Sequence, residues 1–187
     1  MKLRNLTLGI LAAGSLMVAT AGLAQTATPT PAPAQGTAQQ LDGDDEDFLE
    51  NAAQSGHAEI EGSKMAQEKA TSPDVKSFAE KMIQDHTKVG DELAALAKEK
   101  GYTPPTEPSL VQKAKLKTLS MTDDGFDEMY ADQIGVSAHE DAVKLFQDAS
   151  ANAKDADIKA FAAKHLPALQ EHLEMAKALQ QKVSQRK

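Results

Sequence analysis

The chain contains no cysteine and no tryptophan, and its aromatic residues are limited to two tyrosines and five phenylalanines among 187 residues. The absence of cysteine excludes disulfide bonds, thiolate metal sites and lipid attachment at a cleavage-site cysteine. With so few aromatic rings, the chain also lacks a surface on which nucleic acid bases would stack. Strand-like alternation of polar and apolar residues is not evident anywhere, which argues against a β-sheet protein.

Positive charge is also scarce, since 20 Lys and Arg face 28 Asp and Glu, for a net charge of −8. Residues 1–24 contain Lys2, Arg4 and no acidic residue, so without them 18 basic and 28 acidic residues remain, a net charge of −10. Nucleic-acid binding requires a basic surface, and so does electrostatic docking on anionic lipid. We therefore expect no nucleic acid partner, and a soluble protein whose charge attracts cations.

The N-terminus holds the one long apolar run. Lys2 and Arg4 precede the run, and Gly22-Leu23-Ala24 forms a small-x-small cleavage site, so residues 1–24 are expected to be a signal peptide. An uncleaved anchor is the alternative, because residues 6–24 are 19 residues long and close to spanning length. The many small residues of this run make it a weak membrane span. We expect export to the periplasm, or association with the outer membrane, with no transmembrane segment after cleavage.

Two regions follow the signal peptide. Residues 25–40 are rich in Pro, Ala, Thr and Gln and contain no large apolar residue, which is typical of a disordered linker. We place the end of this linker at residue 43, where an acidic stretch leads into the first helix. Residues 44–185 have the length and apolar content of one domain.

Apolar residues recur at helical spacing in four long segments of this domain. The first segment runs from about Asp45 to Ala70, and its stripe contains Phe48, Ala52, Glu59 and Ala66. The second segment has Ser72 as its N-cap, Pro73 in the first helical position and Gly101 at its end. Its stripe contains Val75, Phe78, Met82, His86, Val89, Leu93 and Leu96.

We expect Thr122-Asp123-Asp124 to cap the third segment, whose stripe contains Phe126, Met129, Val136, His139, Val143 and Phe146. The fourth segment starts near Asp155 and carries Ile158, Phe161, His165, Leu169, His172, Ala176 and Leu179. Pro167 lies inside the fourth segment and should kink it or interrupt its hydrogen bonds. Between the second and third segments, prolines precede a short helix over residues 109–119, with an apolar face of Leu110, Leu116 and Leu119. The pattern predicts an all-α, up-down four-helix bundle.

Four stretches carry a resemblance to a known family: FLENAAQSGHAEIEGSKMAQEKA (48–70), VKSFAEKMIQDHTKVGDEL (75–93), SAHEDAVKLF (137–146) and IKAFAAKHLPALQEHLEMAKAL (158–179). They resemble the domain of unknown function 4142 family of exported bacterial proteins, and the similarity covers residues 44–183. The resemblance implies a ferritin-like four-helix bundle outside the cytoplasm. Together with the residue pattern, the expected fold is a ferritin-like up-down four-helix bundle with a short extra helix in the connection between helices 2 and 3. The family has no established activity, so the resemblance implies a fold rather than a function.

Each long segment places one metal-capable side chain on its core-facing stripe: Glu59, His86, His139 and His172. Buried acids and imidazoles are tolerated only when they are paired, hydrogen-bonded or bound to metal. Three imidazoles and a carboxylate complete a tetrahedral set for a transition metal ion such as zinc, copper or iron. Met82 and Met175 share helix faces with two of these histidines, which would favour copper, and His165 lies seven residues before His172.

The sequence argues against ferritin-type iron chemistry. Di-iron bundles use Glu-x-x-His pairs, whereas Ile83, Val136 and Leu169 stand three residues before the three histidines. The chain also lacks a cysteine nucleophile, a Gly-x-Ser-x-Gly turn and a glycine-rich phosphate loop. A metal-dependent redox enzyme is therefore the weakest interpretation, and we assign no catalytic residue.

Two stronger interpretations remain. The leading one is a non-catalytic cell-envelope bundle, structural or stress-protective, in which the buried His and Glu form a hydrogen-bonded network that fixes helix register. The alternative is a periplasmic protein that sequesters or carries copper, zinc or iron through Glu59, His86, His139 and His172. Converging histidine nitrogens would favour metal binding. An envelope protein partner is also open, because the linker could hold the bundle away from an envelope surface.

Overall fold

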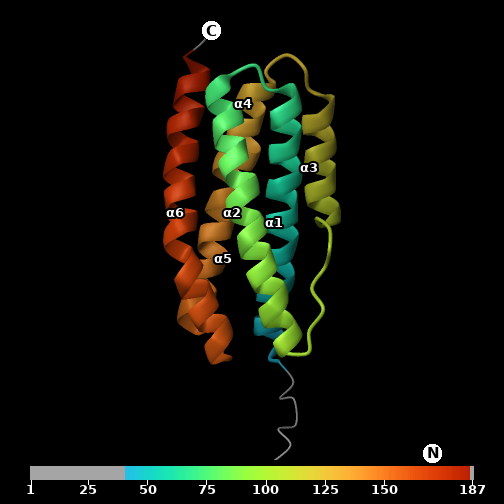
Figure 1. The fold of residues 1–187 in the computed structure, drawn as a ribbon, viewed down its shortest axis with the longest axis vertical. Coiled ribbons are helices and arrows are strands. Elements are labelled where there is room, and N and C mark those ends of the chain that lie inside the picture. Colours follow the sequence, from blue (N-terminus) through green and yellow to red (C-terminus); the bar gives the residue numbers. More distant parts are fainter. Residues whose placement is uncertain (1–40, 186–187) are drawn as a thin grey trace, which may run out of the picture. The chain divides into compact units, whose positions relative to one another are not determined.

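A computed structural model describes residues 41–185. Its elements are α1 (Gly43–Lys69), α2 (Pro73–Glu99), α3 (Leu110–Met121), α4 (Phe126–Tyr130), the π-helical η1 (Ala131–Ser137), α5 (Ala138–Asn152) and α6 (Ala156–Ser184). α4, η1 and α5 follow one another without a break and form the third long helix of a four-helix bundle (Figure 1). The expected signal peptide and nearly all of the linker lie outside the described residues. Among those described, no helix is long and apolar enough to cross a membrane.

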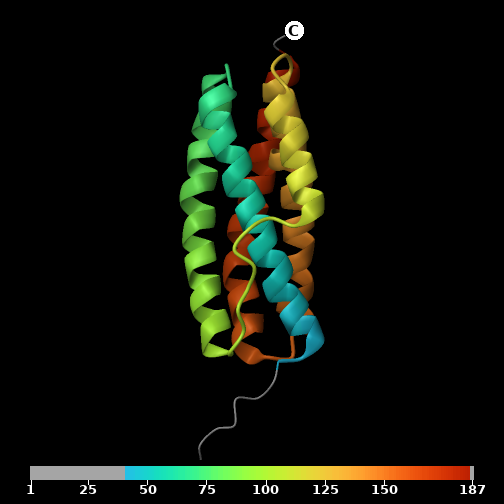
Figure 2. The same cartoon turned by 90° about the vertical axis from the view of Figure 1, so that its right-hand side faces the viewer.

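The bundle consists of two helical hairpins, α1 with α2 and α5 with α6. After α2, an irregular segment and then α3 run along the outer side of α1 (Figure 2). They return the chain to the end of the bundle at which α2 began. The third long helix therefore runs in the same direction as α2, as a ferritin-like bundle with one long connection requires. The predicted fold class is confirmed, and the structure adds this one break in the alternation of helix directions.

Local sequence explains most of the helix starts. Ser109 and Gln112 form a reciprocal capping box, with Gln112 N 3.3 Å from Ser109 Oγ and Ser109 N 2.8 Å from Gln112 Oε1. Asp155 accepts hydrogen bonds from the first amides of α6, as predicted. The predicted cap at Thr122-Asp123-Asp124 is wrong, because Thr122 ends α3 and Gly125 occupies the N-cap of α4 with φ 79°. Only glycine adopts this left-handed conformation without steric cost.

Each hairpin turn is held by an aspartate from the other hairpin. The buried carboxylate of Asp45, in the first turn of α1, accepts hydrogen bonds from the amides of Lys154 and Asp155 at 3.1 and 2.8 Å. At the opposite end, Asp127 of α4 accepts from the amides of Thr71 and Ser72 at 3.1 and 2.9 Å. These contacts satisfy backbone donors that a helix end leaves without an intrahelical partner.

The third long helix departs from the predicted register. Met129 and Val136 are only half-buried, whereas Tyr130 and Ile134 are buried in the core. The π-helical turn explains this difference, because its wider turn shifts the buried stripe relative to the 3.6-residue period assumed from the sequence. Leu110 is a second exception, since it was predicted on the buried face of the short helix and is 84% exposed. Pro167 lies on the exposed side of α6, and the helix continues through it without ending.

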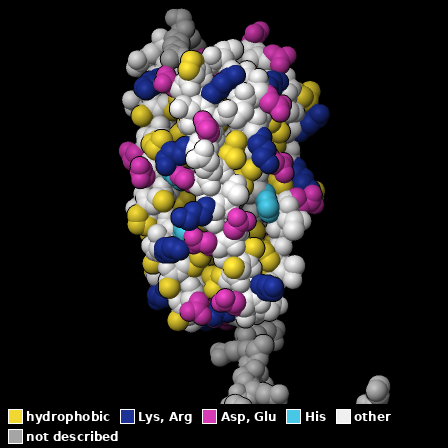
Figure 3. Space-filling view, viewed as in Figure 1, with side chains coloured by type: hydrophobic (Ala, Val, Ile, Leu, Met, Phe, Trp, Pro, Cys, Tyr) yellow, Lys and Arg dark blue, Asp and Glu magenta, His cyan; other side chains and the backbone are white. Residues whose placement is uncertain are grey.

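The apolar core consists of two clusters. One cluster includes Phe78, Met82, Phe126 and Tyr130, and the other includes Phe48, Leu93, Phe146 and Phe161. Between them, every long helix contributes one buried polar side chain at the same height: Glu59, His86, His139 and His172, here called the histidine layer. This layer is the main polar feature of the core. On the surface over these helices, acidic and basic side chains are interspersed (Figure 3).

Candidate metal centre

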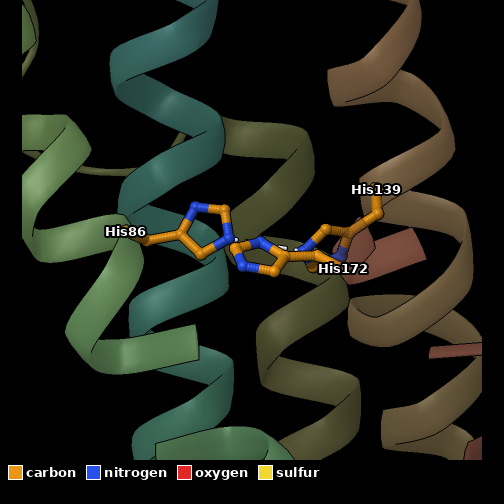
Figure 4. A group of neighbouring side chains, drawn as sticks. All are labelled: His86, His139 and His172. Atoms are coloured by element: carbon orange, nitrogen blue, oxygen red, sulfur yellow. Dashed lines mark hydrogen bonds between the residues drawn. The ribbon is translucent and has the colours of Figure 1, made fainter. Parts of the chain in front are cut away.

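The structure brings the four predicted core residues together. Glu59 comes from α1, His86 from α2, His139 from α5 and His172 from α6, and each is at most 4% exposed. The three rings face one another (Figure 4), with centroids 5.3 Å apart for His86 and His139, 5.4 Å for His86 and His172, and 5.6 Å for His139 and His172. Periodicity alone had placed these residues on their helices, and the bundle places them in one layer.

His86 lies between Glu59 and His139. Its Nδ1 is 2.8 Å from Glu59 Oε2, so the ring donates a hydrogen bond to the carboxylate. On its other side, its Nε2 lies 3.3 Å from His139 Nε2. Glu59 therefore orients the His86 ring and directs Nε2 toward the centre of the layer.

His139 is oriented by the π-helical turn that precedes it. Its Nδ1 donates to the carbonyl oxygens of Gly135 and Ile134, at 2.8 and 3.1 Å. A carbonyl only accepts hydrogen bonds, so Nδ1 carries the proton and Nε2 is left with a lone pair. Gly135 also permits close packing, because a Cβ at this position would lie 3.3 Å from Ala176 Cβ on α6. The turn thus fixes both the tautomer of His139 and its approach to α6.

His172 is oriented by Asp85 of α2, which the sequence analysis did not single out. Its Nε2 donates to Asp85 Oδ2 at 2.8 Å, and this oxygen also accepts from Lys81 Nζ at 2.9 Å. The other ring nitrogen, Nδ1, is buried and has no hydrogen-bond partner among the described residues. Asp85 does not lie on the core-facing stripe of α2. Its role is visible only in the fold, where it lies next to His172 of α6.

The three rings are oriented in the same way. Each donates one N–H outward, to a carboxylate or to backbone carbonyls, and keeps its other nitrogen for the interior of the layer. Histidine ligands of protein metal ions almost always have such an outer acceptor, which fixes the tautomer and ring orientation. One ring nitrogen from each histidine lies within 4.8 Å of the other two.

Electrostatics favour one positive charge in the layer. Burial alone would lower the pKa of His86, but the Glu59 carboxylate outweighs burial and raises it. Burial lowers the pKa of His139, and burial together with repulsion from His86 lowers the pKa of His172 to about 4. Burial would raise the pKa of Glu59, yet the neighbouring histidines bring it below its ordinary value. A proton on His86 Nε2, donated to His139 Nε2, satisfies both nitrogens when no other cation is present.

The distance between His86 Nε2 and His139 Nε2 suits two ligands of one metal ion. Two nitrogens bound at about 2.0–2.1 Å in tetrahedral geometry lie about 3.3–3.4 Å apart, and the observed distance is 3.3 Å. The third nitrogen requires only a small approach, since the widest of the three separations is at most 4.8 Å. Three imidazoles can therefore converge on one ion with little movement of the rings.

The other predicted candidates lie around the layer. Met82 is buried in the adjoining apolar cluster, and Met175 packs half-buried against the same cluster. His165 does not join the layer, because its Nε2 lies 2.9 Å from Glu92 Oε2. Tyr130, which the sequence analysis did not single out, is fully buried beside the layer, and its hydroxyl lies 2.9 Å from Ser63 Oγ. Burial raises the pKa of Tyr130, so its hydroxyl stays protonated.

The fold and the site define a class: a ferritin-like four-helix bundle with a buried layer of three histidines. The chain belongs to the family described as Domain of unknown function (DUF4142), which matches residues 30–179. This finding confirms the resemblance seen in the sequence. No curated protein matches the chain significantly.

Solved structures with the same fold include a DUF305 fragment from Deinococcus radiodurans, with TM-score 0.66 and 12% identity over 77% of this chain and 99% of that one. CopM in its Cu(I)-bound form has TM-score 0.63 and 18% identity over 74% and 96% of the two chains. A conserved hypothetical protein, rv2844, from Mycobacterium tuberculosis has TM-score 0.59 and 19% identity over 73% and 90%. At these identities the similarity establishes the fold.

Proposed function

We propose that this protein binds one transition metal ion, copper in preference, through His86, His139 and His172. The observation that carries the proposal is the convergence of the three rings, one nitrogen of each lying within 4.8 Å of the other two. The outward N–H of each ring is already held by an acceptor. The inward nitrogens therefore present lone pairs to a common point, as a metal ion requires.

Charge supports a cation at this point. Glu59 is 2% exposed, and its Oε1 accepts no hydrogen bond from any described residue. A buried carboxylate needs a compensating positive charge. In this proposal Glu59 is a positioning residue that holds His86 and balances the ion, and a proton on His86 replaces the ion when no metal is bound.

Copper is favoured by the ligand types and by the structural relatives. Imidazole binds copper, zinc, iron and nickel, and copper(II) stands highest among the divalent ions in affinity for such sites. CopM has been solved in Cu(I)-bound, Cu(II)-bound and silver-bound forms, and it shares this fold. The buried thioether of Met82, one helical turn from His86, suits the softer Cu(I).

The role that follows is sequestration or transport of the ion rather than catalysis. The three histidines are nearly excluded from solvent, and the layer contains none of the Glu-x-x-His pairs of di-iron enzymes. Export to the periplasm or the outer membrane, expected from residues 1–24, would place such a protein and its ion outside the cytoplasm.

Metal content and calorimetric titration of the purified protein test this proposal. We expect one copper ion per chain in the wild type and none in a triple variant, His86→Gln/His139→Gln/His172→Gln. Glutamine keeps polarity and approximate size, and circular dichroism checks that the variant is folded. His165→Gln serves as the matched control and should bind copper normally. A folded wild-type protein that binds neither copper, zinc nor iron would contradict the proposal.

The second candidate is a purely structural layer. It is favoured by the direct contact of His86 with His139 at 3.3 Å, which a single proton would satisfy. In that case the triple variant would lose stability, while the wild type would bind no metal. Titration of the wild type, together with thermal unfolding of the triple variant followed by circular dichroism, therefore separates the two functions.

A further inference from the structure

A cavity of about 450 Å³ lies between α1 and α2, beneath the irregular segment Thr103–Thr106. Small residues on the two facing helices leave this space open: Ala52, Ala53 and Gly56 on α1, and Gly90 and Ala94 on α2. A Cβ added at Gly56 or at Gly90 would meet no other atom within 4 Å. The cavity is thus a consequence of the sequence on both walls rather than of a loose turn.

The walls of the cavity are mainly apolar. Its deeper part is bordered by side chains of all four long helices, including Ile60, Leu93, Ala142, Phe146 and Leu169. Polar side chains gather where the irregular segment and the helix surfaces form the rim: Ser55, His57, Thr87, Asp91, Thr103 and Thr106. Glu59 and His86 also contribute to the lining and connect the cavity with the histidine layer.

The cavity opens to the surface at its rim, and its apolar part offers no polar partner to the water molecules that enter it. Displacement of such poorly ordered water by an apolar group favours binding. Pockets that bind small molecules have volumes of this order, with apolar walls and a few polar groups.

The charges around the cavity restrict what it accepts. Asp91 at the rim disfavours an anion, and the apolar walls would remove the water that an anion needs. A cation would have to leave water for apolar walls, which costs more than the transfer of a neutral molecule. An ionised carboxylate only accepts hydrogen bonds, and Asp91 offers such an acceptor at the rim. The matching ligand is uncharged and carries a hydrogen-bond donor.

We propose that this cavity is a binding site for a small, uncharged, mainly apolar molecule with a hydroxyl group, a phenol or an alcohol of about two rings in size. Apolar walls hold its body, and the hydroxyl donates to a polar group of the lining. The site is separate from metal binding, because its walls consist largely of residues that do not belong to the histidine layer.

Titration of the full chain with 2-naphthol, followed by the fluorescence of the ligand and by NMR shifts, tests this site. We expect saturation at one molecule per chain, with shifts at Ala53, Leu93 and Phe146. The double variant Gly56→Leu/Gly90→Leu should bind at least about tenfold more weakly, since leucine side chains fill the space. It should remain folded, because leucine favours helix more than glycine does. Gly43→Leu, outside the cavity, is the matched control and should bind as the wild type does.

A second ligand tests the charge. We expect 2-naphthoate, which replaces the hydroxyl by a carboxylate, to bind at least about tenfold more weakly than 2-naphthol, because its charge must leave water for apolar walls beside Asp91. Equal binding of the two ligands would overturn the proposed ligand class. Absence of saturable 2-naphthol binding, or unchanged binding in the double leucine variant, would overturn the site itself. Copper binding by the double variant reports on the histidine layer independently, so the two proposals fail separately.

Discussion

His172 and His165 lie on the same side of α6, seven residues apart, and the structure treats them in nearly the same way. Each ring donates its Nε2 proton to a carboxylate of α2, at 2.8 Å to Asp85 and at 2.9 Å to Glu92. Each carboxylate also accepts from a lysine. The difference lies at the other side of the ring, where His172 faces two further imidazoles and His165 packs on Phe161 with centroids 4.5 Å apart.

This comparison shows that a buried histidine–carboxylate pair is not by itself a site. Around His165, one carboxylate and one apolar neighbour give the ring a structural role. Around His172, the same carboxylate contact leaves a nitrogen that converges with two others. The function of the pair therefore depends on what the remaining helices bring to the same height of the bundle.

The largest expected effect comes from exchanging the two histidines for glutamine one at a time. His172→Gln should weaken copper binding by more than about 100-fold, because a ligand is removed rather than an outer partner. His165→Gln should leave the affinity within about twofold of the wild type, since His165 is bonded to Glu92 and contributes no nitrogen to the histidine layer. Calorimetric titration of both variants measures the difference. Equal affinities for the two variants would show that His172 is not a ligand.

An intermediate effect is expected from the two carboxylates. Asp85→Asn should weaken copper binding by about 10–100-fold, the usual result of removing an outer acceptor of a histidine ligand. Glu92→Gln changes the equivalent partner of His165 and should not alter copper affinity. A competition assay with a copper indicator resolves both values. If both substitutions weaken binding equally, general loss of negative charge explains the effect and the positioning role of Asp85 is wrong.

The smallest expected effect is a pH dependence of stability at His165. Burial lowers its pKa in the folded protein, more than the hydrogen bond to Glu92 raises it. Below the unfolded value of 6.5, the unfolded chain therefore holds more protons at this residue than the folded chain does. Stability from this group is present above pH 6.5 and is lost as the pH falls toward the folded pKa, by at most about 1.4 kcal/mol per pH unit.

Urea unfolding of the metal-free wild type and of His165→Gln between pH 7 and pH 4 measures this dependence. The difference in unfolding free energy between the two proteins should shift in favour of the variant as the pH falls. A difference that does not change with pH would show that His165 has the same pKa in both states. The comparison cancels the titrating groups that do not contact His165.

Local signals in the sequence predicted the helix starts because capping depends on residues that are close in the chain. Ser72 and Pro73 at the start of α2 and Asp155 before α6 are of this kind. The histidine layer was accessible for a related reason. Apolar periodicity identifies the buried stripe of each helix, so polar residues on that stripe stand out.

Contacts between helices were not accessible in the same way. Asp85 and Asp127 look like ordinary surface acids in the sequence, yet one orients His172 and the other holds the turn before α2. Which residues meet across helices depends on which helices are neighbours and on their relative heights. Neither quantity is written in the periodicity of a single helix.

The sequence alone determined an all-α bundle of this family and the four core residues Glu59, His86, His139 and His172. The tertiary structure decided that three of these residues turn one nitrogen toward a common centre. It did so through the π-helical turn, which gives His139 backbone acceptors, and through Asp85 of α2, which gives His172 its partner. Burial follows from local patterns, whereas convergence requires side chains of different helices to be oriented together.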